Sequence, residues 1–433
     1  MGHLREKIGA YGLRDITSTS TFRQSGITIA GTLANGALSA VFYILVARIL
    51  GPANFGLLTV AIATLTLIAD IGDLGTDTGL VRFVGKYLAK DVAKVKRFLK
   101  IGLEVKVAVW LFVLVLGWIL APSLSEVIFS KPELTQSLRI SFIGVGSYLL
   151  YSYIIHALQG FQKFWTWGGF QVGASGTRVL IIILLFLYSK LNLETTMVVF
   201  VSVPLLAFLV GLFLLPINFF EVKKETSVAK EFFQYNKWVA AFTAVAALGA
   251  RLDTFISARL LTAAEVGVYG AAHKLVVIVP QLVGALGTVM APKMAGMGKL
   301  SDFVSYLKKS QILVLGISVL GILSIPVVLY LIPILFGREY IASGPLFVVL
   351  LFAMLFFLIS VPIHMAVIYY YSYPKLFLWI SLGYLAIIAG VGWILISSFG
   401  AIGAAFTVLI GNIFNLVLPA FWVLRRIRTQ STD

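Results

Sequence analysis

Cysteine is absent from this sequence of 433 residues, which excludes disulfides and thiolate metal sites. Charged residues are scarce too, at 12% against roughly 25% in soluble domains. The only histidines, His3, His156, His273 and His364, are too scattered along the sequence to suggest a metal cluster. Hydrophobic residues, in contrast, make up 60% of the chain, and its mean hydropathy is +0.99. The surroundings of such a chain are lipid.

Twelve stretches are long and apolar enough to cross a membrane, for which about 20 residues are needed. Runs such as IIILLFLY do not alternate between apolar and polar residues, which disfavours an outer-membrane barrel. We therefore predict an all-α polytopic membrane protein. The twelve stretches are residues 26–48, 55–80, 101–121, 138–160, 165–188, 195–219, 236–261, 265–291, 310–335, 345–371, 374–398 and 400–424.

The distribution of basic residues predicts the orientation. The segments on the N-terminal side of the membrane hold 24 of the 34 lysines and arginines, and the opposite loops hold three. Such a bias places both termini in the cytoplasm and the chain in the cytoplasmic membrane. It also accounts for most of the net charge of +16, so no nucleic-acid partner is implied. The segment before Ile27 lacks the apolar core of a signal peptide and is interpreted as a cytoplasmic tail.

An internal repeat is visible in two phrases, ARILGPANFG at 47–56 and ARLLTAAEVG at 258–267, which align at an offset of 211. Each phrase ends the first helix of a six-helix unit, turns outside the membrane and starts the second helix. The polar stretch 220–237 separates the units, so we predict an N-terminal lobe over 1–222 and a C-terminal lobe over 223–433. Because six is even, the repeats are parallel, and such a pair can rock around a central cavity.

Both phrases resemble turns of the polysaccharide transporter family, within the superfamily of multidrug and toxin extruders and lipid II flippases. ILFGREY at 334–340, GAIGAAFTVLIG at 400–411 and ALQGFQKF at 157–164 are also similar to segments of that family. The resemblance implies a V-shaped pair of six-helix lobes. It further implies transfer of a lipid-linked sugar from the cytoplasmic leaflet to the outer one.

Charges inside membrane helices cost at least about 2.5–3.5 kcal/mol each, so they are the first candidates for a site. Arg178, Arg251 and Lys274 fall at mid-membrane, where they could bind the phosphate or pyrophosphate of a lipid-linked sugar. Asp253 lies at similar depth and could neutralise Lys274 or serve in coupling. Two arginines at the outer helix ends, Arg48 and Arg259 of the repeated phrases, are either fold signals or parts of an outer gate.

Three aspartates, Asp70, Asp73 and Asp77, are spaced by three and four residues and so share one face of the second helix. They could bind a coupling cation, Na⁺ or H⁺. They could equally pair with Arg82 or other basic residues near the cytoplasmic end, which we favour. No other cofactor is expected.

The function that these features favour is flipping of a lipid-linked oligosaccharide by alternating access, for the synthesis of surface polysaccharide. The alternative is a multidrug or toxin exporter of the sister family, which would need more acidic residues at mid-membrane. An enzyme is not expected, because the sequence shows no nucleophile–base constellation, no nucleotide loop and no sizeable segment outside the membrane. We expect a monomer whose partners are the lipid-linked oligosaccharide and membrane lipids.

Overall fold

The computed structural model describes residues 20–223, 225–373 and 375–430, and these residues form helices and connecting turns without a β-strand. Most of the predicted N-terminal tail lies outside the described residues. The first half of the described chain consists of α3 (Ser20–Gly72), α4 (Thr76–Tyr87), α5 (Val92–Ser123), α6 (Thr135–Gly160), α7 (Phe164–Leu187) and α8 (Leu193–Leu214).

The second half is divided into shorter pieces. Three of its predicted spans are each built from two consecutive helices. Its helices are α9 (Thr226–Gly249), α10 (Leu252–Leu260), α11 (Ala263–Val276), α12 (Ile278–Ala295), α13 (Leu300–Leu323), α14 (Ile325–Leu335), α15 (Ser343–Met365), α16 (Lys375–Phe399) and α17 (Ala401–Gln430). Single turns of π or 3₁₀ helix lie at Leu124–Ile128, Pro132–Leu134, Arg338–Tyr340 and Ala366–Tyr370.

The first predicted outer turn divides α3 into two arms. Gly51 has a φ of 73° and a ψ of 170°, and Pro52, which lacks an N–H, starts the second arm. Eleven helical segments of the described chain are long and apolar enough to span a membrane, and the first of them holds both arms of α3. The described residues therefore cross twelve times, as the sequence predicts.

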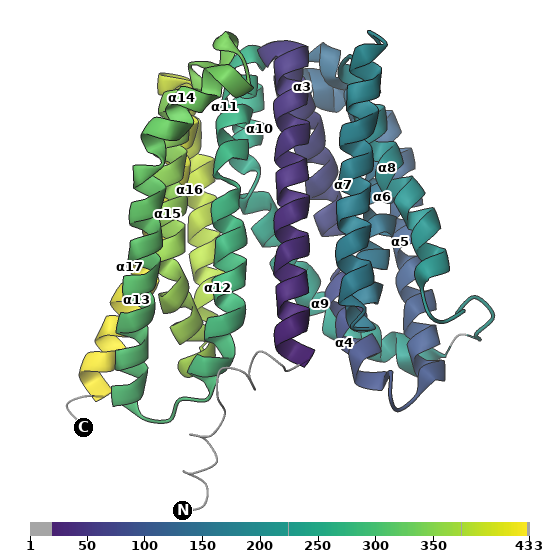
Figure 1. Cartoon of the computed structure of the whole chain (residues 1–433), viewed down its shortest axis with the longest axis vertical. Coiled ribbons are helices and arrows are strands. Elements are labelled where there is room, and N and C mark those ends of the chain that lie inside the picture. The colour runs from purple at the N-terminus through teal and green to yellow at the C-terminus, as the bar shows by residue number, and fades with distance from the viewer. Residues whose placement is uncertain (1–19, 224, 374, 431–433) are drawn as a thin grey trace, which may run out of the picture.

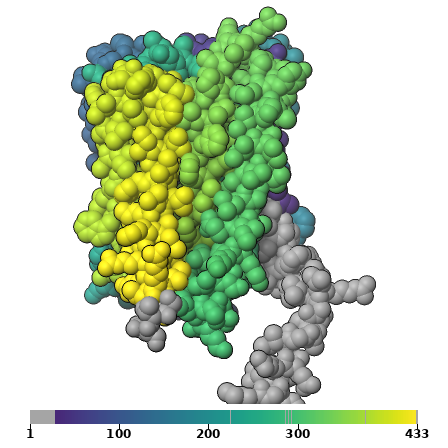
Figure 2. Space-filling model, turned by 90° about the vertical axis from the view of Figure 1, so that its left-hand side faces the viewer, coloured from purple at the N-terminus to yellow at the C-terminus, as the bar shows by residue number. Residues whose placement is uncertain are grey.

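Two bundles of helices stand side by side and spread apart toward the face where α3 begins and α17 ends (Figure 1). We call this the terminal face and the opposite one the distal face. Figure 2 shows α17 in yellow beside α13 in green along one flank of the molecule. Ile312, Leu320 and Phe421 of these helices are among its most exposed large apolar side chains. Apolar surface on this scale fits contact with lipid.

Two of the interruptions in the predicted membrane helices lie beside the candidate charged residues. The second ends at Gly72 and resumes as α4 after Leu74 and Gly75, which have φ values of 51° and 74°. The seventh is interrupted between Gly249, where α9 ends, and the start of α10, and Arg251 in this break has a φ of −132°. Consequently the three aspartates do not share one continuous helix face.

The first half of α9 packs on the N-terminal lobe, although it follows the predicted boundary at 222. Glu231 pairs with Lys94 at 2.7 Å and with Lys86 at 3.3 Å. Phe232 is buried against two further rings of that lobe, with ring centroids 5.9 and 5.7 Å away. Much of the polar stretch 220–237 is thus helical and tied to α4 and α5 near the terminal face.

Candidate functional site

A cavity of about 410 Å³ lies between the lobes. We call it the central cavity. Its N-terminal wall is mostly apolar and aromatic, whereas its C-terminal wall carries the cations Arg251 and Lys274 together with His273. Its lining also includes Tyr43, Phe55, Thr59, Ala63 and Thr66 of α3, Tyr148 of α6, Phe200 of α8, Thr254 of α10, and Tyr269 and Gly270 of α11.

Arg251 joins the two lobes across this cavity. Its Nη2 donates to Asp70 Oδ2 at 2.6 Å, and its Nε donates to Thr66 Oγ1 at 2.9 Å. The break before α10 makes this possible, because Arg251 stands just outside the helix and reaches toward α3. Asp70 therefore pairs with a cation of the other lobe rather than with Arg82, whose guanidinium lies 4.3 Å from the ring centroid of Tyr235.

Lys274 lines the same cavity, and its ammonium lies 4.0 Å from the ring centroid of Tyr43. In the part of the chain that the structure describes, no carboxylate lies within ion-pair distance of it. The predicted neutralisation by Asp253 is not formed, since Asp253 accepts a hydrogen bond from the Tyr269 hydroxyl. Lys274 is thus a cation in a largely apolar cavity, with the aromatic face of Tyr43 beside it.

Arg178, the third predicted cation, lies behind the wall of the central cavity. Its guanidinium is 4.5 Å from the ring centroid of Phe200 and 5.5 Å from that of Phe42. Among the described residues, its buried Nε has no hydrogen-bond partner. Aromatic faces attract cations, so these rings hold the charge beside the cavity rather than in it.

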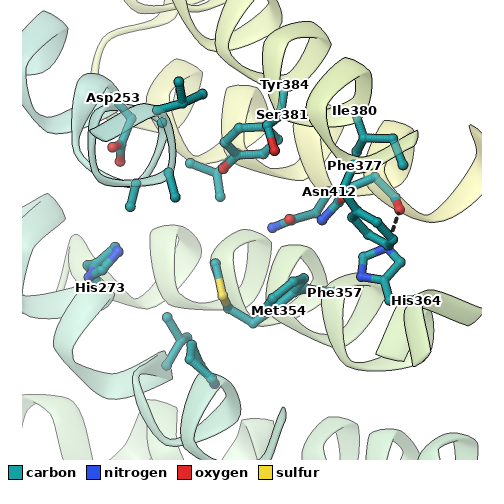
Figure 3. A pocket seen from close by; sticks show the side chains of 18 of the residues that line it. Asp253, His273, Met354, Phe357, His364, Phe377, Ile380, Ser381, Tyr384 and Asn412 are labelled. Atoms are coloured by element: carbon teal, nitrogen blue, oxygen red, sulfur yellow. Dashed lines mark hydrogen bonds between the residues drawn. The ribbon is translucent and has the colours of Figure 1, made fainter. Parts of the chain in front are cut away.

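A second cavity, of about 470 Å³, lies inside the C-terminal lobe. Figure 3 shows Asp253 and His273 toward one end of it, and His364 with Asn412 toward the other. The His364 ring nitrogen Nε2 lies 2.9 Å from the Asn415 carbonyl oxygen. His273 of α11 and Ala250, in the break between α9 and α10, line both cavities, so the two spaces lie on either side of these residues.

A polar cluster inside the N-terminal lobe is not predicted as a unit by the sequence. We call it the α4–α6 cluster. Lys106 of α5 is fully buried, and its Nζ lies 2.6 Å from Asp73 Oδ1 and 2.9 Å from Asp77 Oδ1. The other members are Ser152, which donates to Asp77, and His156, whose Nδ1 lies 3.2 Å from Asp77 Oδ1. These two aspartates thus pair with a basic residue, as favoured above, but that residue is Lys106.

Asp73 holds the break between α3 and α4 in place. Its carboxylate accepts hydrogen bonds from Thr76 Oγ1 at 2.7 Å and from the backbone N–H of Asp77 at 3.2 Å. A side-chain acceptor at this position satisfies one of the free amide groups in the first turn of α4. The sequence signal for this cluster is Lys106, a lysine within a predicted span. Its partners could not be identified from the sequence, because Asp73 and Asp77 belong to a turn and a helix about 30 residues earlier in the chain.

Near the distal face, the arginines of the repeated phrases cross to the opposite lobe. Arg48 Nη1 donates to the Ile334 carbonyl at the end of α14. Arg259 Nη1 donates to the Val127 carbonyl at 2.8 Å and to the Ser130 hydroxyl. Both contacts join a helix end of one lobe to the outer connection of the other. We call this set of contacts the distal seam.

Two further groups extend the distal seam in the same reciprocal way. Lys131 Nζ donates to the Ala258 carbonyl and, at 2.6 Å, to the Leu261 carbonyl. The Tyr340 hydroxyl donates to the Ala47 carbonyl at 2.9 Å. Ala47 and Ala258 are equivalent positions of the repeat, so each lobe supplies a donor for the same helix end of the other.

The model of the polysaccharide biosynthesis protein family matches residues 22–298 of the sequence. No curated protein matches it. Among solved structures, a multidrug resistance MATE family transporter of the MOP superfamily, in an inward-facing conformation, superposes with a TM-score of 0.71 at 14% identity. That match covers 94% of this chain and 99% of the transporter.

Two further solved structures are similar. Lipid II flippase MurJ, in an inward closed conformation, has a TM-score of 0.73 at 14% identity, covering 92% of this chain and 87% of the flippase. A MOP superfamily transporter from Pyrococcus furiosus has a TM-score of 0.63 at 15% identity, covering 94% and 95%. At such identities these likenesses show the fold alone, that of a two-lobe membrane transporter.

Proposed function

The chain belongs to the family of polysaccharide biosynthesis proteins, and from this premise we propose that it flips a lipid-linked oligosaccharide across the membrane. The cargo carries a phosphate or pyrophosphate between lipid and sugar. Transport proceeds by alternating access, in which the lobes rock about the central cavity. The terminal face lies in the cytoplasm, because the segments on that side carry most of the lysines and arginines.

One observation carries the proposal: Lys274 stands in the central cavity without a carboxylate partner among the described residues. A cation taken out of water is costly unless a counter-charge arrives. The phosphate of the cargo supplies this charge. Arg251 lines the same cavity and already offers part of its guanidinium to Asp70, so a phosphate can share the remaining donors.

The distal seam supports alternating access. Arg48, Arg259 and Lys131 bind backbone carbonyls of the opposite lobe, so these contacts form only when the lobes meet at that face. In the other state of the cycle the seam separates and releases the sugar. The arginines thus act as an outer gate as well as marking the repeat.

The alternative cargo is a drug, since one structural neighbour is named a multidrug resistance transporter, and a cationic drug is the case that differs in charge from a lipid-linked phosphate. The charge of the central cavity disfavours it. Asp70, beside the cavity, is bound to Arg251, and Asp253 lies in the C-terminal lobe bonded to Tyr269. A cation entering this cavity meets Lys274 before it meets a free carboxylate.

The test uses the full chain in liposomes with a fluorescent pyrophosphate-linked oligosaccharide, and translocation is followed by quenching of the accessible leaflet. Lys274→Gln is expected to slow flipping by about tenfold or more, since a hydrogen bond between charged groups is worth roughly 1.5–3 kcal/mol. Lys309→Gln, at an exposed lysine of α13 away from the cavity, is the matched control and should flip at the parental rate.

A cationic dye is assayed in the same vesicles. Flipping of the lipid-linked sugar without export of the dye supports the proposal. Export of the dye alone, or an unchanged flipping rate in Lys274→Gln, would overturn the assignment of an anionic cargo to this cavity.

A further inference from the structure

No member of the α4–α6 cluster is among the residues that line the central cavity. Its charged members come from three elements: Asp73 from the turn before α4 together with Asp77 from α4, Lys106 from α5 and His156 from α6. Charges buried in a membrane protein are costly and mark ion pathways and proton relays more often than ordinary packing. The question is which ion this cluster serves.

A metal cation has no place between the two aspartates. The ammonium of Lys106 already occupies the position between the carboxylates of Asp73 and Asp77, at 2.6 and 2.9 Å. Within the described ranges, no group of three or more His, Cys, Asp or Glu residues is placed to hold a metal ion. Na⁺ would have to displace a fully buried lysine. A proton needs no coordination sphere and can bind to a side chain already present.

The charge of the cluster is not balanced without a proton. Two carboxylates and one ammonium leave one negative charge, and a proton on the imidazole of His156 neutralises it. The ring is placed for this, with its Nδ1 3.2 Å from Asp77 Oδ1 and 2.9 Å from the Ser152 carbonyl oxygen. Burial of a net charge is unfavourable, so the neutral cluster is more stable when it is buried, and the charged cluster is more stable when water can reach it.

His156 is also the accessible member. Its side chain is 32% exposed, whereas that of Lys106 is 0% exposed and those of Asp73 and Asp77 are 12% and 16% exposed. His156 lies about one helical turn before the end of α6 at the terminal face. A proton can therefore reach the ring from that side, and the buried carboxylate of Asp77 behind it stabilises the charged form.

Few charged groups face His156. Asp77 of α4 and Lys106 of α5 act on the ring directly. Ser152 of its own helix is uncharged, and so is Asn236, which α9 presents to α4. The charge state of the ring is therefore set by the cluster itself.

The cluster adjoins the contact between the lobes. A Cβ added to Gly75, in the turn that Asp73 stabilises, would lie 2.7 Å from the Asn236 carbonyl oxygen of α9. The side chain of Asn236 is buried without a hydrogen-bond partner among the described residues. The backbones are therefore in close contact here, but the Asn236 side chain adds no hydrogen bond between α9 and the N-terminal lobe. Asp77 is two residues from Gly75 and two from Gly79, both of which approach Asn236, so the cluster lies next to the contact with α9.

We propose that the α4–α6 cluster is a proton-binding site, that His156 takes up the proton, and that its occupancy controls the seating of α9 on the N-terminal lobe. Proton binding then couples to the rocking of the lobes. The coupling part rests on the proposed flipping function, whereas the proton site itself does not.

The site is tested first without any cargo. The full chain is labelled with ¹³C-histidine, and the four ring signals are followed from pH 5 to 8, with His156→Gln identifying the relevant one. The His156 ring is expected to titrate in this range, with a midpoint that Asp77→Asn changes by about one pH unit or more. The signal of His364, in the other lobe, is the internal control, and Asp77→Asn should leave its response to pH unchanged. A His156 signal insensitive to pH or to Asp77→Asn would overturn the site.

Coupling is tested with the liposome assay under an imposed gradient. A pH gradient should speed flipping severalfold in the parental chain, a Na⁺ gradient should not, and His156→Gln should flip equally fast with and without the pH gradient. Acceleration that persists in His156→Gln would overturn coupling through this site. If no lipid-linked sugar moves in any variant, the proposed function fails, while the histidine titration still decides the proton site.

Discussion

At the distal seam, the second arm of α3 and helix α11 touch backbone to backbone. A Cβ added to Gly56 would lie 1.8 Å from the Ala263 carbonyl oxygen, and one added to Gly267 would lie 1.9 Å from the Pro52 carbonyl oxygen. An ordinary carbon–oxygen contact is about 3.3 Å or longer, so Gly56→Ala must separate the two backbones by about 1.5 Å. Because the obstructing atoms are backbone, no rotamer change relieves the clash.

The clash exists only while the lobes meet at the distal face. Overpacking of this kind costs about 1–3 kcal/mol. Applied to one state of a two-state equilibrium, that penalty shifts the populations about 5- to 150-fold toward the state open at the distal face. Gly267→Ala should have the same effect, because the two glycines occupy equivalent places in the seam.

The absence of cysteine from the sequence provides a direct assay. Thr254→Cys places one thiol in the lining of the central cavity, and a membrane-impermeant maleimide is added from the distal side. Gly56→Ala should speed labelling in proportion to the population shift. Gly173→Ala, where an added Cβ meets nothing within 4 Å, is the control and should not. Unchanged labelling in both Gly56→Ala and Gly267→Ala, with intact melting temperatures, would refute the reasoning.

Three further substitutions test the polar contacts. Lys106→Met leaves two buried carboxylates without their cation and should destabilise the protein by about 3–5 kcal/mol, seen as a lower melting temperature in detergent; a melting temperature equal to the parental one would contradict the pairing. Arg48→Ala and Arg259→Ala each remove charged donors worth roughly 1.5–3 kcal/mol and should speed the same thiol labelling. Arg338→Ala, at an exposed arginine near the distal face, is the control, and its thiol should be labelled at the parental rate. If Arg48→Ala and Arg259→Ala are labelled at the same rate as this control, the distal seam does not depend on Arg48 and Arg259.

Features encoded locally could be predicted from the sequence. The twelve crossings follow from the length of apolar runs, and the outer turn at Gly51 and Pro52 follows from residues that end a helix wherever they occur. The repeated phrases likewise identify the helix ends that meet at the distal face. Each of these inferences needs only a short window of sequence or a comparison of the chain with itself.

Pairings between distant helices could not be predicted in the same way. Asp70 pairs with Arg251 because the seventh span is interrupted between α9 and α10, and Gly249 alone does not signal that break. Lys106 stands near the start of a predicted span, directly after a run of cytoplasmic lysines, where a charge at the membrane surface is equally expected. Only the arrangement of α4, α5 and α6 shows that it is buried between two carboxylates.

The repeat also shows why an arginine stands in both copies of the phrase. A two-fold interface is reciprocal, so a residue that contacts the partner's surface has an equivalent that does the same in return. The two lobes obey this rule at the distal seam, where Arg48 and Arg259 each donate to a backbone carbonyl near an outer helix end of the other lobe. Keeping the phrase in both repeats therefore keeps both halves of one interface.

The central cavity departs from this reciprocity in its charge. Equivalent positions of the two repeats line it on both sides, including Thr59 with Gly270 and Ala63 with Lys274. At the same offset of 211, Arg251 corresponds to an alanine of the first repeat. Both cations of the cavity thus come from the second repeat, and the first repeat supplies apolar counterparts. The features that the repeats share hold the lobes together, so the residues in which they differ are the ones that would give the cavity the anion selectivity that we propose.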